Sequence, residues 1–289
     1  MVFFLTRIYG YLYGLAQDRL GVQPRGLGYC LRLNRRDRVF SIRGQIMHFD
    51  HRVAAAYGRL VAGSWNEPET HLFLDAVIAG HEGALAFVDV GASVGEFVID
   101  VARHDKVTRV VAFEPLAECA EAVRRSAELN GLRKVEVIPK LVNEDGRTSF
   151  LSYDVRRPTA SAAGAADGED VSREIPAIAL DQALDDLDGD VVLLIDVEGG
   201  EAGVLRGAHG LLRRCAPLVI FEYNSTSRKH FDLDDIRDAL GEGYDIYRLT
   251  GSGTLDLDLE RSWNCVAVSA TSPFKPLCNA LFRPAGRRA

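Results

Sequence analysis

The chain has 289 residues, of which 47% are hydrophobic, and it carries a formal net charge of −7 with a pI near 5.6. This length fits one large α/β domain plus an appendage, and the hydrophobic content excludes a globally disordered chain. The acidic balance argues against a nucleic-acid binder that depends on a general basic surface. We therefore expect no nucleic-acid partner.

The first element in chain order is the apolar segment at residues 1–16, which Arg7 interrupts. It is shorter than the roughly 20 apolar residues that a membrane span needs. We expect an amphipathic helix packed on the domain and no stable membrane span, with weak peripheral membrane contact as the alternative. The five cysteines are scattered without metal-ligand spacing, which indicates reduced thiols in a cytoplasmic protein.

Residues 1–80 are expected to form an N-terminal cap over the ligand-binding edge of the main domain. The cap is predicted to contain an antiparallel pair, Tyr29–Leu33 with Val39–Ile42, followed by a helix around Glu67–Ile78. We assign residues 81–270 to the main domain and residues 271–289 to a flexible basic tail.

Within the main domain, short apolar β-type segments alternate with helical segments, which is typical of a doubly wound parallel sheet. Most of these segments are continuously apolar, as expected of strands that are buried on both faces. The expected strands are Ala86–Val90, Arg109–Glu114, Val135–Val142, Val191–Val197, Leu218–Tyr223, Tyr244–Leu249 and Asn264–Ser269. The expected helices are Glu96–His104, Leu116–Asn130, Glu201–Arg214 and Leu233–Gly241, the last with Asp232 as N-cap. The composition of Asp154–Glu174 favours a solvated linker, with a mobile lid as the alternative.

The segment Phe87–Gly95 predicts a strand, a tight loop and the start of a helix. Gly91 and Gly95 allow the backbone to approach a ligand closely, and the helix start offers free N–H groups. A dinucleotide-binding loop would carry glycines where Ser93 and Glu96 stand. Asp89 and Glu96 would repel a pyrophosphate but suit a ligand that presents an ammonium and a sulfonium cation.

Glu114 ends the second expected strand, where a carboxylate can accept hydrogen bonds from both ribose hydroxyls. Leu141 and Val142, at the next strand end, would flank an adenine ring or simply belong to the core. Together with the loop, these features favour S-adenosyl-L-methionine over a nicotinamide cofactor.

A second group of acids follows the fourth expected strand, in Leu194–Glu201, and a further acid, Glu222, ends the fifth. Asp196 and Glu198 lie on the same side of the strand by alternation, where the transferable methyl group would be. A base assists methyl transfer to a hydroxyl, and Asp196, Glu198 and Glu222 are the candidates. Glu201 is interpreted as the acidic first turn of a helix. We expect no metal, although three acids could hold Mg²⁺.

At this point the residues resemble a known family. The motifs Val88–Gly95, Ala112–Pro115 and Ile195–Glu201 are similar to those of the FkbM-type methyltransferases. The resemblance continues in Trp65–Glu69, Asn143–Gly146, Val204–Ala208 and Ile220–Glu222. It implies a class I methyltransferase (Rossmann-like) sheet of seven strands, one of them antiparallel, and O-methylation of hydroxyls on sugars or natural products.

Carried over by position, the resemblance assigns the site. The predicted cofactor-binding residues are Asp89, Gly91, Ala92, Ser93, Gly95, Glu114, Pro115 and Leu141. The residues that border the acceptor are Asp196, Glu198 and Glu222. The chain departs from the family where Ser93 replaces a usual Asn and Gly200 a usual Ala.

Three other functions stay open: a catalytically silent protein that binds a nucleoside cofactor, a NAD-type oxidoreductase, and a nucleic-acid methyltransferase. The missing glycines and Asp89 oppose the oxidoreductase. The acidic balance opposes the nucleic-acid enzyme. We expect a small-molecule or glycan hydroxyl acceptor, whose identity the sequence does not give, and the oligomeric state is equally unspecified.

Overall fold

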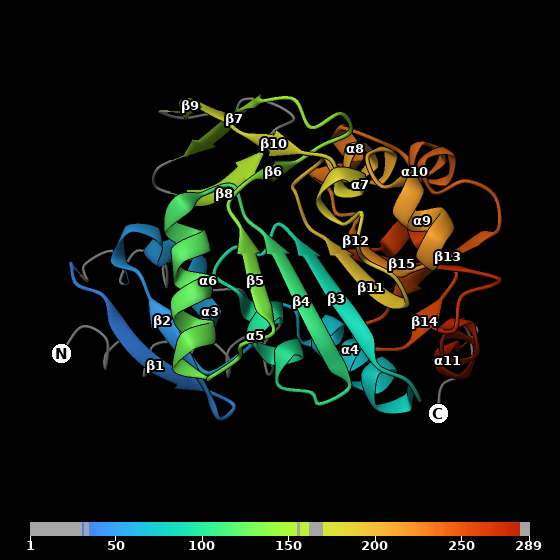
Figure 1. Cartoon of the computed structure of the whole chain (residues 1–289), viewed down its shortest axis with the longest axis horizontal. Coiled ribbons are helices and arrows are strands. Elements are labelled where there is room, and N and C mark those ends of the chain that lie inside the picture. Colours follow the sequence, from blue (N-terminus) through green and yellow to red (C-terminus); the bar gives the residue numbers. More distant parts are fainter. Residues whose placement is uncertain (1–30, 32–34, 155–156, 162–169, 284–289) are drawn as a thin grey trace.

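The computed structural model describes residues 31, 35–154, 157–161 and 170–283. Its centre is an eight-stranded sheet in the order β14-β13-β15-β12-β11-β3-β4-β5 (Figure 1). The strands are β3 (Leu85–Val90), β4 (Val107–Phe113), β5 (Val135–Ile138), β11 (Asp190–Ile195), β12 (Leu218–Glu222), β13 (Tyr244–Leu249), β14 (Leu255–Asp256) and β15 (Asn264–Ser269). All seven expected strands are present, and the two-residue β14 adds an eighth. Among the seven, β15 is the antiparallel strand, because it runs against both β12 and β13.

Helices cover both faces of this sheet, which confirms the doubly wound α/β class. One face packs against α4 (Pro68–Gly80), α5 (Glu96–Ala102), α6 (Ala117–Leu129) and α11 (Lys275–Leu281). The other face packs against α7 (Leu180–Ala183), α8 (Glu201–Arg206), α9 (His209–Cys215) and α10 (Leu233–Leu240). Neighbouring residues of one strand enter opposite cores, as Phe87 and Val88 do. This double burial explains why the strands are continuously apolar.

The helix expected over Glu201–Arg214 is two helices, α8 and α9, and this prediction was therefore wrong in its continuity. A Cβ atom on Gly207 would lie 2.4 Å from the Asn143 carbonyl oxygen, so the chain turns there against another segment. The Asp181 carboxylate then accepts the N–H groups of Gly210 and Leu211, at 2.7 and 2.8 Å, and caps α9. The break depends on tertiary contacts. The Asp232 cap of α10 is confirmed, since its side chain accepts from two backbone N–H groups.

The strand expected over Val135–Val142 also divides, into β5 and β6 (Leu141–Val142), with Pro139 between them. Proline cannot donate to a strand ladder, and β6 pairs instead with β10 (Ala177–Ile178). Leu141 and Val142 are both buried at this junction.

The described part of residues 1–80 contains β1 (Arg38–Ile42), β2 (Gln45–Phe49), η1 (His51–Tyr57), α3 (Gly58–Val61) and α4. Val39–Ile42 pairs with β2, which corrects the partner that we expected for it. Of Tyr29–Leu33, only Leu31 belongs to the described residues. Tyr57 and Phe73 are fully buried in the same hydrophobic cluster as Phe87 of the sheet.

The linker expected over Asp154–Glu174 was wrong for the residues that the structure describes. β7 (Ser149–Asp154), β8 (Arg157–Ser161) and β9 (Asp170–Ile175) form a three-stranded antiparallel sheet. A continuous ladder between β7 and β9 supplies the backbone pairing that the Ala- and Gly-rich composition does not reveal. In Figure 1 this small sheet lies beside β6 and β10 at one end of the molecule.

The expected flexible tail begins with ordered structure. α11 packs against α4, and Phe274 and Cys278 are fully buried. Cys119, Cys215 and Cys265 are also buried and, like Cys278, unpaired. The N-terminal apolar segment lies outside the described residues, and within the described ones no helix is long and apolar enough to cross a membrane.

Candidate functional site

A cavity of about 480 Å³ opens at the carboxyl ends of β3, β4, β11 and β12. This is the edge of an open α/β sheet where ligands bind. The cavity contains all of the predicted site residues except Gly95, so two groups from distant parts of the chain share one space. Asn66 and Glu67 from the cap also line it.

The loop after β3 begins at Gly91, which has a φ of +94°. A Cβ atom there would lie 1.8 Å from the carbonyl oxygen of Asp196, so only glycine lets the ends of β3 and β11 approach each other. Ala92 and Ser93 continue the loop and line the cavity. Gly95 instead faces away, and a Cβ atom on it would lie 3.2 Å from the Val123 side chain. The structure therefore places Gly95 in the packing of α5 on α6.

Glu114 holds two segments of the cavity wall together. Its carboxylate accepts the N–H of Ser93 and the N–H of Leu116, both at 2.8 Å. Burial raises the pKa of Glu114 to about 7, against the lowering effect of these two hydrogen bonds. Each carboxylate oxygen retains a second lone pair, and so can accept a hydrogen bond from a ligand hydroxyl. Pro115 and Leu141 line the cavity beside it.

The carboxyl group of Asp89, in the cavity wall, has an unusual environment. This residue is only 1% exposed, and its buried Oδ2 atom has no hydrogen-bond partner among the residues that the structure describes. Burial, followed by the charge of Glu114, raises the pKa of Asp89 to about 8. A buried carboxylate without a partner is costly unless a ligand supplies one. Asp89 therefore fits a ligand that brings a cation or a hydrogen-bond donor.

At the other end of the cavity, three carboxylates converge from three segments. Glu67, Asp196 and Glu222 each offer an oxygen, and these oxygens all lie within 4.8 Å of one another. Carboxylates this close repel each other when ionised, which favours a proton on one of them. Burial, followed by the charge of Glu222, raises the pKa of Asp196. Burial, followed by the charge of Glu198, raises the pKa of Glu222 to about 8.

Other side chains donate hydrogen bonds to two of these three carboxylates, those of Glu67 and Glu222. Asn264 and Thr70 donate to Oε2 of Glu67, at 2.6 and 3.1 Å. Asn224 donates to Oε1 of Glu222. These bonds orient two of the carboxylates, whereas none of the described residues donates such a bond to the Asp196 side chain. The three oxygens could coordinate a divalent cation, or one of them could accept the proton of an acceptor hydroxyl.

Glu198 and Glu201 play different parts in the loop that follows Asp196. Glu198 lines the cavity with a positive φ of 54°, which is uncommon for a residue other than glycine. Burial raises its pKa. Glu201 is fully buried and accepts the N–H groups of Val197 and Gly199 at 3.0–3.2 Å. Its role in the helix start, as expected, is structural.

Sequence reasoning missed Glu67 as a site residue, along with Asn66, Phe97 and Lys140, which all line the cavity. The signal for Glu67 was present in the Trp65–Glu69 motif, but nothing in the order of residues shows that it reaches Asp196. Two other polar candidates, His209 and His230, are exposed. His71 is buried directly behind the cavity wall.

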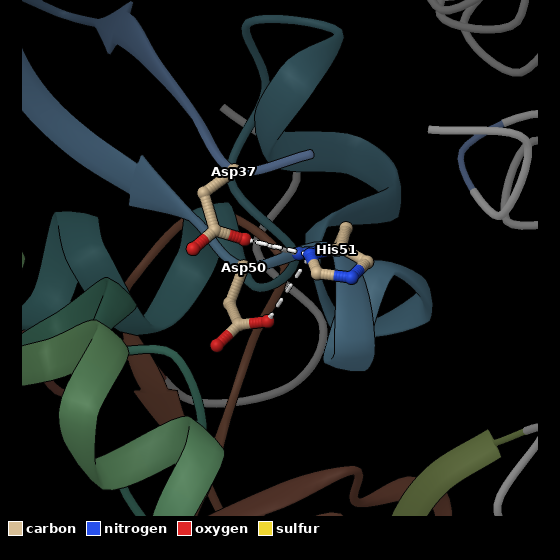
Figure 2. Close-up of side chains that lie close together, drawn as sticks. All are labelled: Asp37, Asp50 and His51. Atoms are coloured by element: carbon tan, nitrogen blue, oxygen red, sulfur yellow. Dashed lines mark hydrogen bonds and ion pairs between the residues drawn. The ribbon is translucent and has the colours of Figure 1, made fainter. Parts of the chain in front are cut away.

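A separate cluster lies in the cap, where Asp37, Asp50 and His51 come together (Figure 2). His51 Nδ1 is 2.8 Å from Asp37 and 4.0 Å from Asp50. Asp50 already binds the Arg52 guanidinium through both of its oxygens. Because Asp37 and Asp50 already have the partners His51 and Arg52 and none of the cluster residues lines the cavity, we assign the cluster a structural role.

Comparison with known proteins adds a family. A model of the methyltransferase FkbM domain matches residues 89–246. The structure is similar to the FkbM methyltransferase of Methylobacillus flagellatus KT, with a TM-score of 0.46 and 17% identity over 75% of this chain. The chain spans 53% of that protein's length. A precorrin-6y C5,15-methyltransferase of Geobacter metallireducens GS-15 gives a TM-score of 0.39 and 12% identity, over 68% of this chain and 87% of the other. No curated protein matches the chain.

Proposed function

Because the chain belongs to the FkbM methyltransferase domain family, we propose that it transfers the methyl group of S-adenosylmethionine to a hydroxyl of a saccharide or natural-product-like small molecule. One observation carries this proposal. A single cavity has Asp89 and Glu114 at one end and Asp196, Glu198 and Glu222 at the other. The first pair suits the charged and ribose parts of the cofactor, and the second group suits a hydroxyl that must lose a proton.

The cofactor end fits S-adenosylmethionine in charge and in hydrogen bonding. The unpartnered Oδ2 of Asp89 would accept from the ammonium group of the methionine part. Glu114 would accept from the two ribose hydroxyls, and Leu141 would contact the adenine ring. When bound, the cofactor supplies an electrophilic methyl group on a sulfonium cation. Two buried carboxylates in this position oppose a pyrophosphate and hence a dinucleotide.

At the acceptor end, the residues of the chain orient the hydroxyl and remove its proton. Because Asp196 and Glu222 lie close together, ionisation of one raises the pKa of the other, so a pair that holds one proton has one carboxylate that can accept a second. As the hydroxyl oxygen attacks the methyl group that the bound cofactor would supply, with the cofactor's thioether as leaving group, this carboxylate would accept the hydroxyl proton. The fixed positions of Glu67 and Glu222 supply the alignment on which an in-line displacement depends. No step requires a metal, although Glu67, Asp196 and Glu222 are the residues that could hold one.

The proposal is tested first by cofactor binding. S-adenosylhomocysteine should raise the melting temperature of the protein, because a ligand that binds only the folded state stabilises it. Glu114→Ala should abolish this shift, whereas Glu242→Ala, on the exposed turn before β13, should preserve it. A melting temperature raised by NADH but not by S-adenosylhomocysteine would overturn the proposal. Mass spectrometry of the purified protein would also show whether the cofactor co-purifies.

Turnover separates an enzyme from a silent binding protein. A panel of hydroxylated acceptors, including neutral saccharides, is incubated with S-adenosylmethionine, and S-adenosylhomocysteine release is measured. Acceptor-dependent release supports O-methyl transfer when the product carries a new methoxy group. Cofactor binding without release for any member of the panel would favour the silent protein instead.

A further inference from the structure

His71 of α4 is buried immediately behind the cavity wall, with both faces of its ring covered. Its side chain is 3% exposed. Trp65 stacks on it at a centroid distance of 4.3 Å and an interplanar angle of 9°. Phe97 stacks at 4.5 Å and 25°. An imidazole between two aromatic rings is well placed to carry a positive charge, because aromatic faces attract cations.

The edge of the same ring contacts two carboxylates of α5. Nδ1 lies 2.6 Å from Asp100 Oδ2, and Nε2 lies 3.1 Å from Glu96 Oε1. An ionised carboxylate only accepts hydrogen bonds, so both ring nitrogens satisfy these contacts only when both carry hydrogen. The geometry therefore fits an imidazolium ion that joins α4 to α5.

Each of the two carboxylates connects the imidazolium to a different part of the cap. Glu96 accepts from the backbone N–H of Asn66 at 2.7 Å and from its side-chain amide. Asp100 accepts from Gln45 at 2.7 Å and from Arg103 at 2.9 Å. His71 thus stands at the centre of a buried network that fixes the cap segment Trp65–Glu67 to the helix that follows the cofactor loop.

This network reaches the cavity directly, because Asn66, Glu67, Glu96 and Phe97 all line it. We propose that protonated His71 is a positioning residue for this cavity, and that ligand binding weakens when His71 loses its proton. The neutral ring would turn a nitrogen lone pair toward Glu96 or Asp100. One contact then becomes repulsive, and the wall formed by Asn66 and Glu67 loses its support. The inference rests on the proposed function only for the identity of the ligand.

The direction of the pH effect follows from the charges around the ring. Burial lowers the pKa of His71, but the hydrogen bonds to Asp100 and Glu96 outweigh it, so the pKa lies above its ordinary value. Asp89 on β3 also lies within electrostatic range, and the cation Arg103 reaches the ring only through Asp100. A base whose pKa is raised in the folded state stabilises that state fully at pH values below the ordinary pKa of the base. This stabilisation is lost as the pH rises through the raised pKa. On the alkaline side of the profile of ligand affinity against pH (the alkaline limb), loss of the His71 proton should therefore weaken binding.

Asp89 and Glu114 determine the acidic side of the same affinity profile (the acidic limb). The pKa values of Asp89 and Glu114 are raised to about 8 and about 7, mainly by burial. Because a cationic ligand favours their ionised forms, affinity gained through them rises with pH over this range. The profile of affinity against pH should therefore pass through a maximum, and only its alkaline side should depend on His71.

The first experiment measures the dissociation constant of S-adenosylhomocysteine by calorimetry from about pH 5 to pH 10, the range in which these groups titrate. The wild-type affinity should fall about tenfold on the alkaline side, a loss comparable to one charged hydrogen bond. The ligand's own ammonium group also titrates at alkaline pH and weakens binding to every variant, so the quantity compared is the difference from wild type. His71→Gln, which cannot be protonated, should show a smaller alkaline loss of affinity than wild type and keep the acidic limb. His104→Gln should match wild type on both limbs, since His104 pairs with Asp75 outside the cavity. An alkaline loss in folded His71→Gln equal to that of wild type overturns the inference.

A second measurement needs no variant that might misfold. The His71 imidazole is titrated by NMR with and without S-adenosylhomocysteine. Coupling between sites is reciprocal, so the ligand should raise the pKa of His71 if protonated His71 favours the ligand. A ring that titrates at or below its ordinary pKa, or one whose pKa the bound ligand leaves unchanged, overturns the inference. Asp100→Asn should move the His71 pKa and the alkaline limb downward together.

The two proposals fail in different ways. A protein that binds no S-adenosylhomocysteine at any pH contradicts the proposed function. The positioning role is then judged in the free protein, where the amide resonances of Asn66 and Phe97 should shift with the titration of His71. Amide resonances that follow another group, or do not shift, overturn it.

Discussion

The two ends of the cavity are built in different ways. The proposed cofactor end is formed by consecutive residues of one strand and loop, from Asp89 to Ser93, with Glu114 at the next strand end. The proposed acceptor end joins Glu67, Asp196 and Glu222, which lie on three separate segments. The first arrangement is fixed by local backbone geometry, whereas the second exists only when the cap is packed on the sheet. This difference suggests that the two ends respond differently to substitution.

The largest effect is expected where the two ends meet, at Gly91. Gly91→Ala would place a methyl group against the Asp196 carbonyl at a positive φ, so it should destabilise folding by about 4 kcal/mol or more. Gly44→Ala is the matched control, since its φ is +84° but nothing lies within 4 Å of the added atom. It should cost about 1 kcal/mol. Urea unfolding measures both variants, and equal losses would show that the contact with Asp196 is unimportant.

The next effect separates the acceptor end from the cofactor end. Asp196→Asn should lower kcat by about 10²- to 10⁴-fold, the usual contribution of a general base. The affinity for S-adenosylhomocysteine should change little, because the cofactor contacts that we propose are made by other residues. Asp238→Asn, on the exposed side of α10, serves as control. Steady-state kinetics and calorimetry test this, and a parallel loss of kcat and cofactor affinity would mean that the two ends are not separable.

A moderate effect of pH is expected on the stability of the ligand-free protein. The pKa of Asp89 is raised to about 8 by burial, so the folded state binds more protons than the unfolded state between the ordinary pKa and this value. Stability should therefore fall as pH rises through that interval, by at most about 1.4 kcal/mol per pH unit for this group. Asp89→Asn should flatten the slope in urea unfolding measured across this range. An unchanged slope would assign the pH dependence to other carboxyl groups.

The smallest effect is expected outside the cavity, in the cluster of Asp37, Asp50 and His51. His51→Ala removes a partly exposed hydrogen bond to Asp37, which should cost less than about 1 kcal/mol. Binding of S-adenosylhomocysteine should be unaffected. A metal chelator should change this binding no more in the variant than in the wild-type protein. A loss of cofactor binding in this variant would contradict the structural role that we assign to the cluster.

Much of the fold could be predicted because its signals are local. Continuous apolar segments gave every strand of the main sheet that was expected, and Asp232 gave the start of α10. The errors fall where distant contacts decide. The helix break at Gly207 depends on Asn143 and Asp181, and the sheet β7-β8-β9 depends on backbone pairing in a segment of low hydrophobicity.

The candidate site divides in the same way. By itself, the sequence determined the glycine-bearing loop, its acids and the acid at the end of β4, because a strand and the loop after it hold their residues in a fixed order at one sheet edge. Only the tertiary structure brought Glu67 to Asp196 and Glu222, and placed His71 between Trp65 and Phe97. The physical reason is that these contacts join the cap to the sheet, and they form through the burial of a shared core that no local pattern encodes.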